Sequence, residues 1–188
     1  YNAAGARTRF VERDEVAEIT GSPRFHGGWF HEEAGHLNPL GYARGLARAA
    51  VAAGARLFCH SPVRSAHRTG STWRLQTPQG AVTAARVIAA TNAYTQACWP
   101  QLRTELVHLP YFNIATRPLS GNLARSILPG RQGCWDTKEI LTSFRFDARN
   151  RLIVGSVGAL RGTGRAIHRR WAAATLKRLF PQLGPVEF

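Results

Sequence analysis

The segment from Asn38 to His60 constrains the fold most, because a capped helix leads directly into a short apolar run. Asn38 is a favourable N-cap, Pro39 suits the first helical position, and Gly54 supplies a left-handed stop. Leucine and alanine recur between these ends at helical spacing, which predicts one apolar helix face packed against a sheet. Residues 55–60 are typical of a buried strand. The close helix–Gly–strand succession therefore predicts an α/β crossover.

Weaker patterns predict the other elements of residues 1–100. The N-terminal 22 residues carry few apolar anchors, so we expect them to run along the surface with one short helical turn. A three-residue turn, Pro78-Gln79-Gly80, separates two alternating segments and predicts a β-meander. A later apolar run is typical of a strand buried in a parallel sheet. The expected segments are a helix at 13–19 and strands at 25–30, 72–77, 81–84 and 87–90.

The character of the sequence changes after Pro100, where segments rich in aromatic residues and arginine predict antiparallel strands. These strands are expected at 107–117, 133–136, 140–147 and 151–155. A final helix, ending at Pro181, is expected to present Ile167, Trp171, Ala174 and Leu179 on one face. The predicted fold class is α/β (α+β), with a first lobe at residues 1–100 and a second, mostly antiparallel lobe at 101–188.

Composition narrows the class of protein. A hydrophobic fraction of 44% and five tryptophans argue against disorder. No apolar run approaches the roughly 20 residues of a membrane helix, so a soluble protein without a membrane partner is expected. Cys59, Cys98 and Cys134 lie far apart and match neither a zinc site nor a disulfide framework. Reduced thiols of this kind favour a cytoplasmic location.

The formal net charge of +14 raises the possibility of a nucleic-acid partner. Only Lys138 and Lys177 are lysines, and the arginines are scattered singly along the chain instead of forming a stripe. We therefore expect no nucleic-acid binding. His26, His31 and His36 suggest a metal, but five-residue steps alternate between the faces of a strand, so no metal site is expected.

Several blocks of sequence, in order, resemble the D-amino-acid oxidase type of flavoprotein, a family that includes glycine oxidase, sarcosine oxidase and gamma-glutamylputrescine oxidase. The blocks are Gly35-His36-Leu37-Asn38-Pro39-Leu40-Gly41-Tyr42, Ser61-Pro62-Val63, Arg86-Val87-Ile88-Ala89-Ala90-Thr91-Asn92-Ala93-Tyr94, Thr116-Arg117-Pro118-Leu119, Phe144-Arg145-Phe146-Asp147, Arg151-Leu152-Ile153-Val154-Gly155 and Leu179-Phe180-Pro181-Gln182-Leu183. The resemblance is greatest to the gamma-glutamylputrescine oxidase group. It covers nearly the whole chain.

The resemblance implies an FAD cofactor and a partial FAD-binding, Rossmann-like first lobe. It places Val63 at the adenine edge through its backbone. It also places Ala90, Thr91 and Asn92 at the carboxyl end of a central strand, where open α/β sheets bind ligands. The alternative is that Asn92 and Tyr94 merely cap a helix that begins at Ala93.

Two departures from the family pattern bear on the chemistry. The family holds the FAD pyrophosphate with G-x-G-x-x-G on an N-terminal strand–turn–helix, and this sequence contains no such motif. The chain is therefore expected to be an interior fragment with apolar surface left bare around Leu57, Val87 and Ile88. Sarcosine oxidases carry a lysine on the strand that resembles residues 151–155, at the position of Ile153 here. A dehydrogenase is thus an alternative to an oxidase.

The substrate implied by the resemblance is a small amine or amino acid whose C–N bond is oxidised. An amino-acid carboxylate is best held by an arginine on a rigid strand, and Arg117 and Arg145 are the candidates. His36 is a further candidate at the flavin edge, whereas no catalytic residue can be assigned. The alternative function is a truncated, flavin-free binding or interaction module. An oligomer is possible under either hypothesis.

Overall fold

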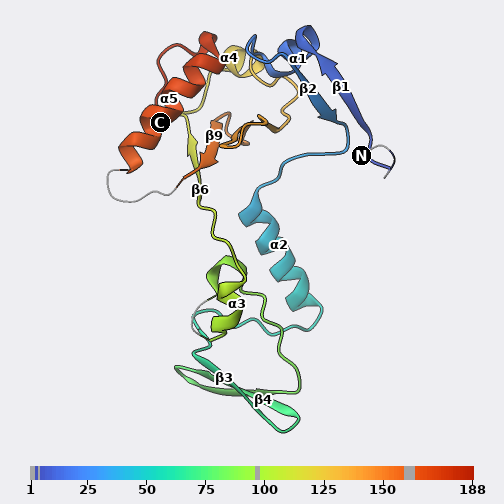
Figure 1. Ribbon diagram of the computed structural model, residues 1–188, viewed down its shortest axis with the longest axis vertical. Coiled ribbons are helices and arrows are strands. Elements are labelled where there is room, and N and C mark those ends of the chain that lie inside the picture. The colour runs from blue at the N-terminus through green and yellow to red at the C-terminus, as the bar shows by residue number, and fades with distance from the viewer. Residues whose placement is uncertain (1–2, 4, 96–97, 159–163) are drawn as a thin grey trace. The chain divides into compact units, whose positions relative to one another are not determined.

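The computed structural model describes residues 3, 5–95, 98–158 and 164–188, and the chain divides into two compact units. The first unit combines residues 1–37 with residues 109–188, and the second comprises residues 38–108 (Figure 1). The boundary expected near Pro100 thus falls inside the second unit. The two units contain mixed helices and antiparallel strands, which agrees with the predicted fold class.

The first unit contains a two-stranded sheet, a four-stranded antiparallel sheet in the order β6-β9-β8-β7, and several helices. Its elements are β1 (Thr8–Glu12), α1 (Arg13–Thr20), β2 (Gly27–His31), β6 (Tyr111–Ala115), α4 (Gly121–Arg125), β7 (Cys134–Trp135), β8 (Thr142–Phe146), β9 (Leu152–Val157), α5 (Gly164–Leu179) and η3 (Pro181–Leu183). The strands expected at 25–30, 107–117, 133–136, 140–147 and 151–155 are confirmed, with bounds that are shifted or, in most cases, shorter. Strand β1 lies where an irregular surface segment was expected.

The core of the first unit lies on one side of the four-stranded sheet. Phe144, Leu152 and Val154 point to this side and are buried, because side chains alternate along each strand. Leu176 of α5 and Phe180 complete the cluster, in which the Phe144 and Phe180 rings meet edge to face at 5.4 Å. One face of the sheet is therefore closed by apolar packing.

Helix α5 buries a stripe that overlaps only partly with the one expected. Its buried residues, Ala172, Thr175, Leu176 and Leu179, are spaced at helical intervals along one face. Of the expected stripe, Leu179 is buried and Trp171 packs against the core, but Ala174 is exposed and Ile167 is 63% exposed, so the prediction is wrong at these two residues. Apolar residues occur on more than one side of this helix, and contact with the sheet selects which of them become buried.

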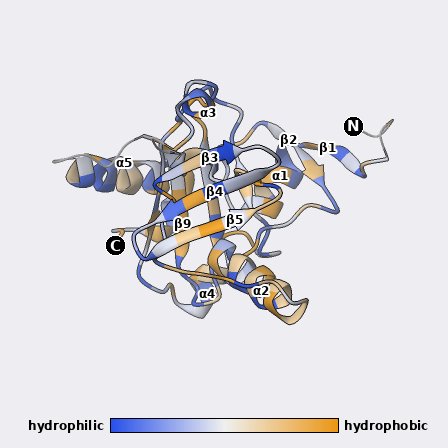
Figure 2. Cartoon of the chain, turned by 90° about the horizontal axis from the view of Figure 1, so that it is seen from below, coloured by the Kyte–Doolittle hydropathy of each residue, from blue (hydrophilic) through white to orange (hydrophobic). Residues whose placement is uncertain are grey.

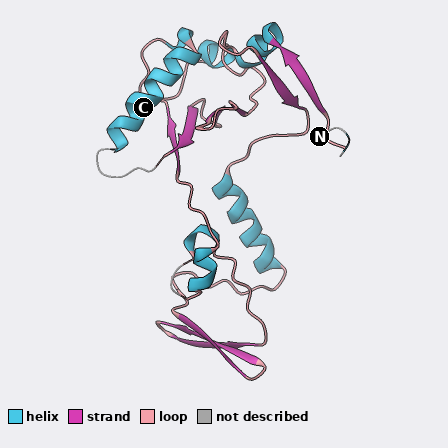
Figure 3. Ribbon diagram, viewed as in Figure 1, coloured by secondary structure: helices cyan, strands magenta, loops and turns pink. Residues whose placement is uncertain are grey.

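The second unit consists of α2 (Pro39–Ala52), the meander β3 (Ser65–Thr69), β4 (Thr72–Thr77) and β5 (Gly80–Ala84), followed by η2 (Asn92–Tyr94) and α3 (Pro100–Thr104) (Figure 3). The predicted start of α2 is confirmed, because the Asn38 Oδ1 accepts a hydrogen bond of 3.0 Å from the Gly41 N–H. Ala53 follows the last helical residue, and Gly54 then takes a φ of 93°. The predicted meander is also confirmed, with β3 as an additional strand.

The strands expected at 55–60 and 87–90 are wrong, since both segments are loops in the second unit. A strand needs a hydrogen-bonded neighbour, and none of the described residues pairs with these segments. The predicted bare apolar surface is confirmed at Leu57, which is 59% exposed, and at Ile88, which is 89% exposed, whereas Val87 is only partly exposed. Helix α2 buries none of its residues, although much of its ribbon has the colour of hydrophobic residues (Figure 2). The expected packing of α2 against a sheet is absent from the described residues.

Neither a membrane-spanning helix nor a cluster of metal ligands occurs among the described residues. None of their helices combines the length and the hydropathy needed to cross a membrane. No three His, Cys, Asp or Glu side chains of this part of the chain gather closely enough to hold a metal ion. The partly buried position of Cys134 in β7 raises the pKa of its thiol to about 11, so this thiol stays protonated at neutral pH.

Candidate functional site

The second face of the four-stranded sheet, here called the open face, lies opposite the core. Strand alternation and the pairing register determine which side chains it carries. Several of these side chains are exposed, in contrast to the buried core face. None of the open-face residues is acidic. They are Tyr111, Asn113 and Ala115 on β6, Ile153, Gly155 and Val157 on β9, Ser143 and Arg145 on β8, and Trp135 on β7.

A group of neutral polar side chains, Tyr111, Asn113 and Ser143, lies over Gly155 in the middle of the open face and is here called the polar notch. Tyr111 reaches across β9, and its Oη lies 2.7 Å from the Ser143 Oγ. A Cβ added to Gly155 would lie 2.7 Å from the Tyr111 Cε1 and 2.6 Å from the Asn113 Oδ1. The missing side chain of Gly155 therefore makes the room in which the Tyr111 ring and the Asn113 amide lie.

Arg145 lies beside this notch on β8, directly across from Ile153 of β9. It is two residues beyond Ser143 on the same strand face, a distance of about 7 Å at the usual rise per strand residue. Within the described part of the chain, no carboxylate forms an ion pair with the Arg145 guanidinium. The open face thus combines one cationic group with a cluster of neutral polar groups.

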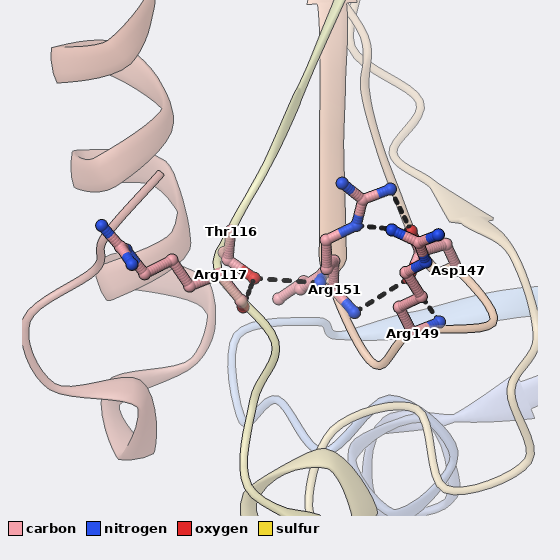
Figure 4. Close-up of polar contacts among 6 residues, drawn as sticks. Thr116, Arg117, Asp147, Arg149 and Arg151 are labelled. Atoms are coloured by element: carbon pink, nitrogen blue, oxygen red, sulfur yellow. Dashed lines mark hydrogen bonds and ion pairs between the residues drawn. The ribbon is translucent and has the colours of Figure 1, made fainter.

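The other two residues predicted for the substrate have partners of their own. The Arg117 Nε lies 3.1 Å from the Glu187 Oε2, and the Arg117 side chain turns away from Asp147 and Arg151 (Figure 4). The His36 Nε2 lies 2.8 Å from the carbonyl oxygen of Arg131. No contact joins Arg117, Arg145 and His36 to one another among the described residues. Their roles in substrate binding stay predictions.

The residues predicted for the cofactor all lie in the second unit. Val63 precedes β3, whereas Ala90 and Thr91 lie in the exposed loop before η2. The Thr91 Oγ1 lies 2.7 Å from the Thr95 Oγ1, and Asn92 has a φ of 43°. The alternative capping role is not observed, because Asn92 is the first residue of η2 and Thr91 precedes it. Their contact with FAD stays a prediction.

The turn between β8 and β9 holds the two central strands of the open face together through Asp147. Its carboxylate accepts hydrogen bonds from the backbone N–H groups of Arg149 and Arg151 and forms an ion pair with the Arg151 side chain at 2.6 Å (Figure 4). Burial by itself would raise the pKa of Asp147, but the hydrogen bonds and the positive charge of Arg151 outweigh it. The net result is a pKa below the ordinary value.

The Asp147→Asn variant should lower the free energy of unfolding by about 2 kcal/mol at pH 7, because it removes a charged hydrogen-bond acceptor. A carboxyl group whose pKa is lowered by folding stabilises the fold above its ordinary pKa, and this contribution is lost as the pH falls through the lowered pKa. The difference between wild type and variant should therefore shrink below about pH 4. Urea unfolding at pH 7 and in acid measures it, with the exposed Glu139→Gln as the charge-matched control. A pH-independent difference would contradict the role of the carboxylate charge.

Sequence reasoning identified Arg145 and Ile153 but missed the polar notch beside them. Tyr111, Asn113 and Ser143 occur at alternate positions of their strands, so period-two alternation could have assigned them to the face that carries Arg145. The contact between Tyr111 and Ser143 crosses an intervening strand. It depends on the strand order β6-β9-β8, which no local pattern specifies.

Comparisons with known proteins agree with this architecture. Residues 1–188 match the family model described as FAD dependent oxidoreductase. The chain is 32% identical over 180 residues to the probable oxidoreductase OrdL of Haemophilus influenzae, and 32% identical over 178 residues to gamma-glutamylputrescine oxidoreductase of Escherichia coli. These alignments cover 94% of this chain and 41% and 42% of the relatives, so the chain spans about two fifths of their length.

A solved structure shares the fold. The crystal structure of glycine oxidase from Geobacillus kaustophilus superposes with a TM-score of 0.70 at 17% sequence identity. The match covers 100% of this chain and 50% of the glycine oxidase chain.

Proposed function

The chain belongs to the FAD-dependent oxidoreductase family, and we propose on that premise that its protein oxidises the C–N bond of an amine that also carries a carboxylate. In this reaction the substrate carbon loses a hydride and the nitrogen a proton, and water then hydrolyses the resulting imine. FAD, when bound, supplies the acceptor for the hydride. The residues of this chain bind and orient the substrate.

The single observation that carries this proposal is the open face, where Arg145 lies on a central strand and no acidic residue accompanies it. An arginine can hold a carboxylate through two parallel hydrogen bonds, and a rigid strand fixes its direction. A polyamine without a carboxylate would find no counter-charge on this face. The open face therefore favours an amino acid or an amine derived from one.

The residues proposed to contact FAD are Val63, Ala90, Thr91 and Asn92. Ala90, Thr91 and Asn92 are exposed, and they lie outside the hydrogen-bonded ladder of the meander. The carbonyl oxygens of Thr91 and Asn92 accept hydrogen bonds from the N–H groups of Tyr94 and Thr95, so the backbone N–H groups of the segment are the ones suited to contact with a nucleotide. The sequence has no G-x-G-x-x-G, so in this proposal the pyrophosphate is held by residues outside the chain.

Among carboxylate-bearing amines, a gamma-glutamyl amine is the substrate we propose. The support is the relative from Escherichia coli, whose name states gamma-glutamylputrescine as its substrate. Ile153 lies on the open face beside Arg145, where the family resemblance suggests a lysine in sarcosine oxidases. We therefore propose an electron acceptor other than oxygen.

The test uses the natural protein that contains this sequence. We expect visible flavin bands, and faster turnover of gamma-glutamylputrescine than of putrescine, which lacks the carboxylate. A dye acceptor should support a higher rate than oxygen does. Arg145→Gln should raise the KM for gamma-glutamylputrescine about tenfold or more, because a charged hydrogen bond is lost. A colourless protein would contradict the proposal and favour the flavin-free binding module.

A further inference from the structure

We propose that Tyr111, Asn113 and Ser143 form a neutral subsite that binds an amide group of the substrate, while Arg145 holds the carboxylate of the same molecule. This inference rests on the proposed function and adds a second point of recognition to it. The subsite is the polar notch above Gly155.

The groups of the notch match the chemistry of an amide. The Tyr111 and Ser143 hydroxyls can each donate and accept a hydrogen bond, and the Asn113 side chain offers an N–H₂ group and a carbonyl oxygen. An amide needs the same two functions, a donor for its carbonyl and an acceptor for its N–H. The notch contains no charged side chain, so a charged group placed there would lose water without gaining a counter-charge. An uncharged polar group is therefore the favoured occupant.

The side chains of the notch are accessible to a ligand, and one hydrogen bond joins two of them. Tyr111 and Asn113 are exposed, and Ser143 is partly exposed. The hydrogen bond of 2.7 Å between Tyr111 and Ser143 holds the two hydroxyls over Gly155 and leaves the remaining lone pairs and the Asn113 N–H₂ for a ligand. Gly155 leaves room that the Tyr111 ring and the Asn113 amide occupy, so a ligand would bind against the exposed outer edges of these two side chains. The subsite thus consists of oriented groups on three adjacent strands.

The distance between the notch and Arg145 limits the length of a substrate that can contact both. Ser143 and Arg145 are separated by about 7 Å along β8. In a gamma-glutamyl amide, the carboxylate and amide carbons lie about 5 Å apart when the chain is extended, and the long, flexible Arg145 side chain can make up the remaining difference. A beta-aspartyl amide is one carbon shorter and fits the two points less well. The expected preference is for gamma-glutamyl over beta-aspartyl amides.

The experiment measures binding of three small probes to the whole chain, labelled with ¹⁵N, by NMR titration. The probes are gamma-glutamylethylamide, beta-aspartylethylamide, and norleucine, which has the carboxylate but no amide. We expect gamma-glutamylethylamide to bind most tightly and to shift the Asn113 side-chain and Gly155 backbone N–H signals. Tyr111→Phe and Ser143→Ala should each weaken this probe about fivefold, the effect of one neutral hydrogen bond, and leave norleucine unchanged. Tyr94→Phe, which removes an exposed hydroxyl in the second unit, is the matched control.

The outcomes test two claims separately: that the notch binds an amide, and that Arg145 binds the carboxylate. If the notch variants bind gamma-glutamylethylamide as wild type does, or weaken norleucine equally, the neutral subsite is overturned. Failure of gamma-glutamylethylamide to bind the chain also overturns it. Arg145→Gln should weaken both gamma-glutamylethylamide and norleucine. If it weakens neither while the notch variants act selectively, the neutral subsite stands and the carboxylate anchor of the proposed function fails.

Discussion

The Gly21→Ala variant should lower the free energy of unfolding by about 3 kcal/mol, the largest effect we expect from one methyl group in this chain. Gly21 ends α1 with a φ of 72°, a conformation that costs an alanine energy. Its added Cβ would also lie only 2.0 Å from the carbonyl oxygen of Ser126, which is backbone and cannot rotate away. Next to this contact, Ile127 and Leu128 are fully buried in the core.

Gly21→Asn separates the two causes, because asparagine tolerates the left-handed conformation of Gly21, with a φ of 72° and a ψ of 19°, but carries the same Cβ. Thermal and urea unfolding should therefore still show a loss of about 2 kcal/mol in Gly21→Asn, the part that comes from the contact with Ser126. A Gly21→Asn variant as stable as the wild type would show that the close approach of Gly21 to Ser126 has no energetic weight.

The Gly155→Ala variant should abolish selective binding of an amide ligand at the open face, with at least a tenfold loss of affinity for gamma-glutamylethylamide. The new Cβ would occupy the space of the Tyr111 ring and the Asn113 amide, and both side chains would have to move. It would also lie 2.9 Å from the backbone carbonyl oxygen of Phe112, so the β6–β9 pair itself is strained. Loss of stability should accompany the loss of binding.

The NMR titration described above measures this affinity, and the Tyr111 signals report whether its ring has moved. Gly28→Ala is the control, because it also adds a methyl group to a strand glycine, and its Cβ would make only ordinary contacts with Val11 and Val16. An unchanged affinity in a folded Gly155→Ala variant would contradict the role of the glycine. A variant that does not fold would leave Tyr111→Phe and Ser143→Ala to decide.

The unburied α2 and the loops around Leu57 and Ile88 agree with a chain that covers about two fifths of its relatives. The apolar stripe of α2 and the apolar loops are local signals for burial, but burial requires a second surface. The described residues of the second unit do not supply that surface. The local pattern predicted the packing of α2, which the described residues do not show, whereas the exposure around Leu57 and Ile88 was expected from the missing G-x-G-x-x-G segment and not from the local pattern.

Local sequence alone determined the elements whose signals lie within a few residues. Asn38, Pro39 and Gly54 set the ends of α2, because capping and a left-handed stop act over one helical turn. The turn before Gly80 set the register of β4 against β5. The ordered blocks of sequence were also sufficient to indicate the flavoprotein family, which the match over residues 1–188 shows.

Only the tertiary structure decided which residues meet across the chain. The buried stripe of α5 depends on the sheet beneath it, and Gly21 is indispensable only because Ser126, far along the sequence, packs against it. The notch of Tyr111, Asn113 and Ser143 exists because β9 lies between β6 and β8 and carries a glycine at the crossing point. Such contacts depend on strand order and on close approach of distant backbone, and neither leaves a periodic signal in the sequence.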